Sequence, residues 1–147
     1  MKKRTIAEML AGERIVELSP SASVREASLL MAKEHVGAVL VCVEDRLEGI
    51  FTERDALSRV LAQHRNPETT QLSEVMTRNP LTIRRQAAAI EALRLMRNGG
   101  FRHLPVVDNG RVVGVVSLRD FCGAELAEIE DELDFQSIVA EGTARRG

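Results

Sequence analysis

The sequence contains no tryptophan and no tyrosine, and only four phenylalanines among its 147 residues. Apolar residues still make up 44% of the chain, so a hydrophobic core must be built mainly from aliphatic side chains. No apolar run approaches the roughly 20 residues of a membrane-spanning helix, and the basic N-terminus is not followed by the apolar segment of a signal peptide. These absences predict a globular, cytoplasmic protein that has no membrane partner.

Cysteine and clustered charge are also scarce. Cys42 and Cys122 lie far apart in apolar segments, which favours buried, reduced thiols over a disulfide framework. The three histidines lie apart from cysteine and carboxylate clusters, so we expect no metal site. The net charge is -2 and the basic residues are scattered, which argues against nucleic acid as a partner.

The most informative feature is an internal duplication with a spacing of 65 residues. Residues 16–55 align without a gap with residues 81–120, and ten aligned positions are identical, including the pairs Arg54/Arg119 and Asp55/Asp120. Such a match indicates two copies of one structural unit. We therefore predict a first repeat over residues 1–65, a second over 66–123, and a C-terminal helix and tail over 124–147.

Hydrophobic periodicity gives both repeats the order β-α-β-β-α, an α/β fold. Ser23 and Glu26 have the spacing of a capping box, and Asn109 with Gly110 is a strong signal for a hairpin turn. The predicted elements of the first repeat are a strand at 14–19, a helix from residue 23, strands at 37–43 and 47–51, and a helix at 53–63. Those of the second are a strand at 80–83, a helix at 88–97, and strands at 103–107 and 111–116.

Three further segments flank these elements. Residues 5–10 and 71–76 resemble each other as short helical lead-ins, and residues 64–70 form a polar, proline-containing link between the repeats. After residue 120, the side chains Leu126, Ile129, Leu133 and Ile138 recur at helical spacing among acidic residues. The resulting amphipathic helix is expected to pack on its own domain or on a second copy.

Each repeat ends a strand and starts a helix with the pattern [ST]-x-x-D, at Thr52 to Asp55 and at Ser117 to Asp120. Local chemistry explains this pattern fully, because the hydroxyl caps the helix and the carboxylate complements its dipole. The same groups also suit a nucleotide, since a helix N-terminus offers donors to phosphate and a carboxylate accepts two hydrogen bonds from a ribose diol. Both readings stay open from the residues alone.

The duplicated units resemble a tandem pair of cystathionine-β-synthase-type (CBS) domains, known as a Bateman module. The resemblance rests on "VREASLLM" with "IEALRLM", on the strand "RHLPVVD", and on a Gly-apolar-apolar-[ST]-x-x-D ending in both copies, and it covers about residues 1–123. It implies two repeats packed about a pseudo-twofold axis, with ligand clefts between them for an adenosine-containing ligand such as AMP, ADP, ATP, NAD or S-adenosylmethionine.

The resemblance implies two candidate sites, each built from both repeats. The residues of the first candidate site are Thr52, Arg54, Asp55, Leu81, Phe101, Arg102 and His103. The residues of the second are Ser117, Arg119, Asp120, Val16, Gly37 and Ala38. Because Arg102 and His103 bring positive charge only to the first, we expect the phosphate to favour the site built on Asp55.

Several of these residues also have purely structural readings. Arg54 and Arg119 either reach phosphate or lie in solvent at a helix start, and Arg102 and His103 either bind phosphate or are ordinary residues at the end of a strand. Phe51 and Phe101 either sandwich an adenine or belong to the core.

The sequence contains no recognisable catalytic constellation, so we expect a protein that is not an enzyme. The expected function is a regulatory module that senses an adenine nucleotide, most simply AMP, and signals to a target protein in trans. The resemblance also implies a homodimer that pairs through its helices. The alternative is a scaffold or dimerisation module without a ligand, in which both [ST]-x-x-D turns only cap helices.

Overall fold

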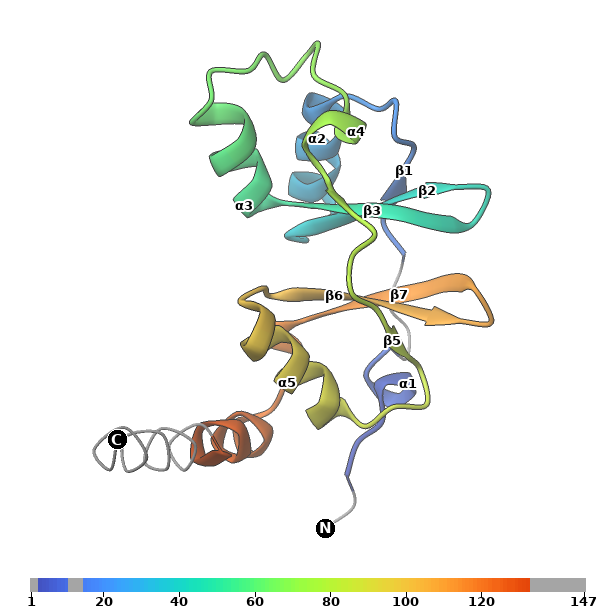
Figure 1. Cartoon of the computed structure of the whole chain (residues 1–147), viewed down its shortest axis with the longest axis vertical. Coiled ribbons are helices and arrows are strands. Elements are labelled where there is room, and N and C mark those ends of the chain that lie inside the picture. The colour runs from blue at the N-terminus through green and yellow to red at the C-terminus, as the bar shows by residue number, and fades with distance from the viewer. Residues whose placement is uncertain (1–2, 11–14, 133–147) are drawn as a thin grey trace, which may run out of the picture.

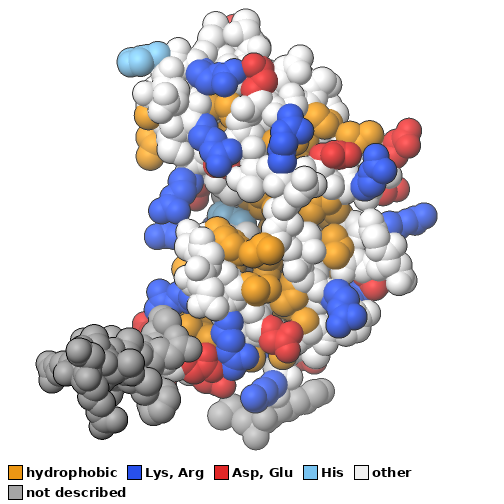
Figure 2. Space-filling model, in the orientation of Figure 1, with side chains coloured by type: hydrophobic (Ala, Val, Ile, Leu, Met, Phe, Trp, Pro, Cys, Tyr) orange, Lys and Arg blue, Asp and Glu red, His pale blue; other side chains and the backbone are white. Residues whose placement is uncertain are grey.

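The computed structural model describes residues 3–10 and 15–132. Two small sheets face each other at the centre, and helices cover the outer face of each sheet (Figure 1). The α/β fold of two similar repeats predicted from the sequence is therefore confirmed. Within the described part of the chain, no helix has the length and hydrophobicity needed to cross a membrane. Basic and acidic side chains are interspersed over the face of the molecule shown in Figure 2.

The first sheet has the strand order β1-β2-β3-β4. Its strands are β1 (Glu17–Leu18), β2 (Ala38–Val43), β3 (Arg46–Thr52) and β4 (Thr77–Arg78). β1 is parallel to β2, and the other neighbours are antiparallel. The first four residues of β2 are apolar and buried on both faces. Val39 and Val41 belong to the core beneath the helices, while Ala38 and Leu40 face the second sheet.

The second sheet repeats this arrangement with the order β5-β6-β7. Its strands are β5 (Ile83–Arg84), β6 (His103–Asp108) and β7 (Arg111–Ser117). Leu104 and Val106 of β6 belong to the core beneath the helices. Val112 and Val115 of β7 pack on the opposite sheet, against the cluster of Ala38, Leu40 and Ile50.

The helices of the two repeats also correspond. The first repeat has α2 (Val24–Glu34), α3 (Glu53–Asp55) and the π-helical segment η1 (Ala56–Leu61), and the second has α5 (Ala89–Gly99) and the short 3-10 helix η2 (Leu118–Asp120). The hydroxyl of Ser23 accepts a hydrogen bond from the Glu26 N–H at 3.0 Å, as the capping pattern predicts. Gly100 ends α5 in the left-handed region at φ 71°.

Both hairpins turn on two residues and carry a β-bulge at equivalent places. Asn109 and Gly110 have φ values of 51° and 78°, which fits the predicted tight turn. Val106 pairs with Gly114, but Val107 pairs with Val112, so β7 has one extra residue there. The first hairpin has the same shift, because Val41 of β2 pairs with Gly49 but Cys42 pairs with Leu47, which leaves one extra residue in β3. The bulge shifts the register by one residue between the turn and the open end of each hairpin.

The two lead-in helices pack on the opposite repeats, which the sequence did not reveal. α1 (Ile6–Met9) buries its side chains in the core of the second repeat, and α4 (Leu72–Val75) buries its own in the core of the first. The chain after α4 passes over Gly49, where an added Cβ would lie 2.8 Å from the Thr77 carbonyl oxygen. Gly114 is similarly close to Leu10.

The C-terminal helix is present over residues 123–132. Ile129 is buried with the core of the second repeat, whereas Leu126 remains 36% exposed. The guanidinium of Arg94 on α5 holds the carboxylate of Glu132 at 2.7 Å. This part of the helix therefore packs on its own domain. The predicted apolar positions Leu133 and Ile138 lie outside the described residues.

Some sequence-based details were wrong. The first strands of the repeats, β1 and β5, are shorter than expected, and Leu81 lies outside β5 with 58% of its surface exposed. Pro80 has no N–H to donate to a ladder, which favours an irregular segment there. Cys122 is exposed rather than buried. Cys42 is half-buried, and burial raises the pKa of its thiol to about 12, with Glu17 adding to the effect.

The exchange of lead-in helices predicts a large effect of Leu72→Ala on the core of the first repeat, although Leu72 lies in the segment predicted as the second repeat. The side chain is fully buried in the core of the first repeat, so the substitution is expected to lower the free energy of unfolding by about 2–5 kcal/mol in urea titrations. Leu81→Ala is the matched control, because its exposed side chain should change stability by less than about 0.5 kcal/mol. Equal effects of the two variants would contradict this packing.

Candidate functional site

Two arginines join the repeats at symmetric positions. Arg54 donates a hydrogen bond to the carbonyl oxygen of Gly100 at 3.2 Å, and Arg119 donates one to the carbonyl oxygen of His35 at 2.9 Å. His35 and Gly100 are the left-handed C-caps of α2 and α5, where carbonyl groups lack helical partners. Each repeat therefore holds the end of a helix of the other repeat.

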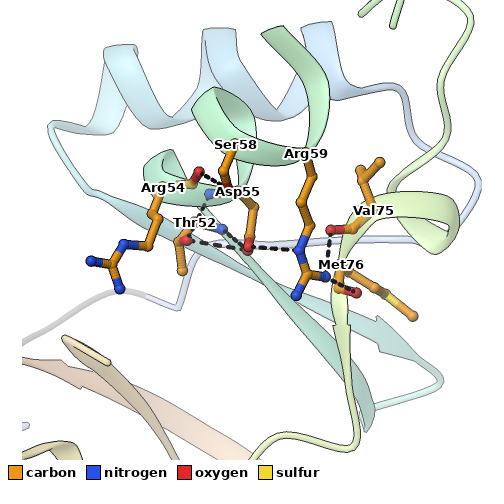
Figure 3. Close-up of polar contacts among 7 residues, drawn as sticks. All are labelled: Thr52, Arg54, Asp55, Ser58, Arg59, Val75 and Met76. Carbon is orange, nitrogen blue, oxygen red and sulfur yellow. Dashed lines mark hydrogen bonds and ion pairs between the residues drawn. The ribbon is translucent and has the colours of Figure 1, made fainter. Parts of the chain in front are cut away.

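Both oxygens of the Asp55 carboxylate have partners (Figure 3). Its Oδ2 accepts hydrogen bonds from the N–H and the hydroxyl of Thr52, at 2.9 and 3.1 Å. Its Oδ1 lies 3.5 Å from the Nε of Arg59. Arg59 also donates to the carbonyl oxygens of Val75 and Met76 at the end of α4. Asp55, which is only 7% exposed, thus links the start of α3 to the exchanged lead-in helix.

The equivalent turn in the second repeat is more open. Asp120 is half-buried, and its Oδ2 accepts a hydrogen bond from the Ser117 N–H at 2.7 Å. The residue equivalent to Arg59 is Ala124, so the duplicated position carries no cation. Among the residues that the structure describes, no side chain pairs with the second oxygen of Asp120. This carboxylate therefore keeps acceptor capacity that Asp55 has lost.

A cavity of about 240 Å³ lies at this open turn, between the two repeats. All six residues predicted for the second candidate site line it. The first repeat contributes Val16, Glu34, Val36, Gly37 and Ala38, and the second contributes His103, Val115, Ser117, Arg119 and Asp120. The predicted second set is therefore brought together in space.

The residues predicted for the first site differ in their exposure, and Arg54 donates to the carbonyl oxygen of Gly100, next to Phe101. Leu81 and the side chain of Arg102 are exposed, and Phe101 packs against the core of the second repeat. Phe51 is fully buried in the core of the first repeat, so it cannot stack on a ligand. Arg102 contributes its carbonyl oxygen, which accepts a hydrogen bond from the Leu118 N–H at 2.9 Å.

His103 lies in the cavity with the second set, although the sequence grouped it with the first. Its Cα pairs with that of Ser117 across the β6–β7 hairpin. Residues directly opposite each other in an antiparallel pair share one face of the sheet. The hairpin register, including the bulge, is the signal that would have placed His103 beside Ser117.

The predicted helix N-terminus is not the main source of donors here. η2 has only three residues, and the Leu118 N–H is already bonded to Arg102. Positive charge in the cavity comes instead from the side chain of Arg119, and His103 adds a ring N–H beside it. Any anion in this cavity would therefore meet side-chain donors.

Arg4 supports the Asp120 turn from outside. Its guanidinium lies 2.6 Å from a carboxylate oxygen of Glu125 and donates to the carbonyl oxygen of Asp120 at 3.2 Å. Glu125 also accepts a hydrogen bond from the Cys122 N–H. The hydrogen bonds from Arg4 lower the pKa of Glu125 to about 2. The N-terminal segment thus braces the turn that carries Asp120.

Comparison with known proteins identifies the duplicated unit. The family described as the CBS domain matches residues 7–62 and again residues 72–127. The chain belongs to the CBS domain family. Its resemblance to a tandem CBS pair, inferred from the repeated motifs, is therefore confirmed.

Curated relatives of this CBS pair include proteins of very different length. A CBS domain-containing protein of Arabidopsis thaliana is 34% identical over 145 residues, which are 98% of this chain and 27% of the relative. A CBS domain-containing protein of Bacillus subtilis is 35% identical over 107 residues, 73% of this chain and 76% of the relative. This chain thus spans about a quarter of the plant relative.

Solved structures of CBS proteins share the arrangement of the repeats. A CBS domain protein of Pyrobaculum aerophilum, complexed with AMP, is 30% identical with a TM-score of 0.78 and covers 87% of this chain and 99% of its own. A CBS domain pair in complex with 5′-methylthioadenosine and S-adenosyl-L-methionine is 26% identical with a TM-score of 0.73. It covers 81% of this chain and 93% of its own.

The Arg4–Glu125 contact predicts a specific acid sensitivity. Because the folded pKa of Glu125 lies below its ordinary value of 4.5, the ionised group stabilises the fold above about pH 4.5, and this contribution is lost as the pH falls toward about 2. In urea unfolding, the wild type should have a higher free energy of unfolding than Glu125→Gln at neutral pH. This difference in free energy should shrink as the pH falls from about 4.5 toward about 2. Glu91→Gln, at an exposed position of α5, is the control. A difference that stays constant with pH would contradict this assignment.

Proposed function

We propose that this CBS pair is a regulatory module that binds an adenine nucleotide, with AMP as the simplest candidate, in the cavity between its repeats. The observation that carries the proposal is that cavity, where Asp120 and Arg119 of one repeat face Gly37 and Ala38 of the other. A ligand there touches both repeats and can therefore favour one arrangement of the pair over another.

The lining groups suit the three parts of a nucleotide. The open oxygen of Asp120 can accept hydrogen bonds from a ribose diol, and Val16, Val36 and Val115 offer an apolar surface to a base. Arg119, which is exposed at the rim, can turn from the His35 carbonyl to a phosphate. The cavity is smaller than the roughly 300–1,000 Å³ of typical ligand pockets, so a nucleotide would fill it and extend to this rim.

This proposal reverses the preference expected from the sequence. We place the ligand at Asp120 rather than at Asp55, because the carboxylate of Asp55 is buried and paired with Thr52 and Arg59. A ribose at Asp55 would first have to displace those partners. Arg102 and His103 do not favour Asp55 either, since the side chain of Arg102 is exposed and His103 lines the Asp120 cavity.

The relatives support an adenosine ligand and a regulatory role. One similar structure is complexed with AMP, and another with S-adenosyl-L-methionine and 5′-methylthioadenosine. The matched relatives are CBS domain-containing proteins, so we propose a module that is not an enzyme and acts on a target protein in trans. The cytoplasm is the proposed location.

Nucleotide binding is tested by calorimetry with AMP. We expect the wild type to bind AMP and Asp120→Ala to lose about 1.5–3 kcal/mol of binding free energy, because a charge-assisted hydrogen bond disappears. Asp55→Ala is the matched variant at the duplicated position. Under conditions in which this variant is folded, it should keep the affinity of the wild type for AMP. Loss of binding in Asp55→Ala alone would move the site to the first repeat.

Thermal unfolding with and without a nucleotide distinguishes the proposed nucleotide-binding module from a scaffold without a ligand. A ligand that binds only the folded state raises the unfolding midpoint, so AMP should raise the midpoint of the wild type but not that of Asp120→Ala. If AMP, ATP, NAD and S-adenosylmethionine all leave the midpoint unchanged, both turns are helix caps only.

We also propose that the module forms a homodimer through the outer helices of the first repeat. Leu29 of α2 and Leu61 of η1 are 57% and 63% exposed and line an apolar cavity of about 230 Å³ with Val24, Ala56 and Val60. Leu57, also 63% exposed, lies one turn away on η1. Exposed apolar patches of this kind mark association surfaces. The resemblance to tandem CBS pairs implies a homodimer that pairs through its helices, so we propose that a second copy of this chain covers the patch.

Light scattering at micromolar concentration tests the dimer. The wild type should have the mass of two chains, and Leu61→Asp should have the mass of one, because the charge would have to be buried in the interface. Leu81→Asp, at a similarly exposed leucine of the other repeat, should remain dimeric. A monomeric wild type, or a dimeric Leu61→Asp, would overturn this interface.

A further inference from the structure

His103 is the titratable base of the central cavity, and its surroundings are unlike those of a surface histidine. It begins β6 and projects into the layer between the two sheets, where its twofold equivalent in β2 is the buried Ala38. Its Nε2 lies 3.1 Å from the position that a Cβ on Gly37 would take. The absence of a side chain at Gly37 is thus what allows the imidazole to reach across to the first repeat.

Charged groups from three elements surround this imidazole. The Oε1 of Glu53 at the start of α3 lies 2.8 Å from the same Cβ position of Gly37. Arg119 and Asp120 of η2 line the same cavity, as does Glu34 at the end of α2, and Arg102 precedes His103 in the chain. Burial lowers the pKa of His103, and Arg119 and Arg102 act in the same direction, while Glu53 and Asp120 oppose them. The imidazole of the empty cavity is therefore mainly neutral at pH 7.

We infer that His103 couples ligand binding to proton uptake: when a phosphate-bearing nucleotide enters the cavity, the imidazole takes a proton from solvent and donates a hydrogen bond to the phosphate beside Arg119. This inference rests on the proposed function. It adds that the cavity binds a nucleotide, which carries a phosphate, more tightly than the corresponding uncharged nucleoside. It also makes the module respond jointly to nucleotide and to pH.

The direction of the coupling follows from charge. A phosphate monoester is mostly a dianion above its second pKa of about 6, and an anion beside an imidazole favours the protonated form. Protonation costs more in the empty cavity, where burial and two arginines oppose it, than in the occupied one. Affinity for AMP should therefore fall, by at most about tenfold per pH unit, as the pH rises above neutral.

The test is calorimetry on the whole wild-type chain at about pH 7.5, in buffers that differ in ionisation enthalpy. The dependence of the observed heat on the buffer gives the number of protons taken up. AMP should take up a substantial part of one proton, and adenosine, which lacks the phosphate, should take up none. The comparison between AMP and adenosine uses only the wild type, so its outcome cannot be affected by a variant that fails to fold.

Two variants assign the proton to a residue. His103→Gln should bind AMP more weakly at low pH and lose the proton uptake, while His64→Asn, at an exposed left-handed position far from the cavity, should retain it. Binding of AMP without proton uptake, or uptake that persists in His103→Gln, overturns the role of His103 and leaves the proposed function intact. If AMP does not bind the wild type at all, the proposed function fails as well.

Discussion

Burial of each lead-in helix in the core of the opposite repeat is the contact on which the rest of the structure depends. Ile6 and Met9 complete the second core, while Leu72 and Val75 complete the first. Each repeat by itself is small, and small units bury too little apolar surface to be stable alone. The exchange therefore joins two incomplete cores, and it presents the two sheets face to face with a cavity at one end of the layer between them.

Duplication supplies the parts of two sites, but single substitutions have made the sites unequal. Thr52 and Asp55 match Ser117 and Asp120 in position and geometry, and both arginines of the pattern hold the opposite helix end. The difference arises four residues later, where Arg59 pairs with the carboxylate of Asp55, whereas Ala124 offers no cation to that of Asp120. In this chain the shared motif therefore performs two tasks: one copy fastens the lead-in helix, and the other lines a cavity.

The sequence predicted the fold well because its strongest signals are local and repeated. The period of apolar residues, the cap at Ser23 and the turn at Asn109 each act within a few residues, and the duplication doubled the evidence for them. The exchange of the lead-in helices was not predictable in this way, because no local pattern shows which of two similar cores a short helix will enter. The place of His103 depended on a one-residue shift within a hairpin, and Arg59 appeared only as an ordinary helix residue.

The bulge in each hairpin has a consequence for how this chain can change in length. Because neighbouring residues of a strand face opposite sides, a regular ladder counted from the turn, with Val113 opposite Val106, would move every later residue of β7 one position from its present partner. His103 would then lie opposite Val116, which belongs to the core beneath the helices, instead of opposite Ser117. The parity of the residue count in the hairpin arms therefore determines which side chains line the cavity, so a change of length there has to open or close a bulge to keep His103 opposite Ser117.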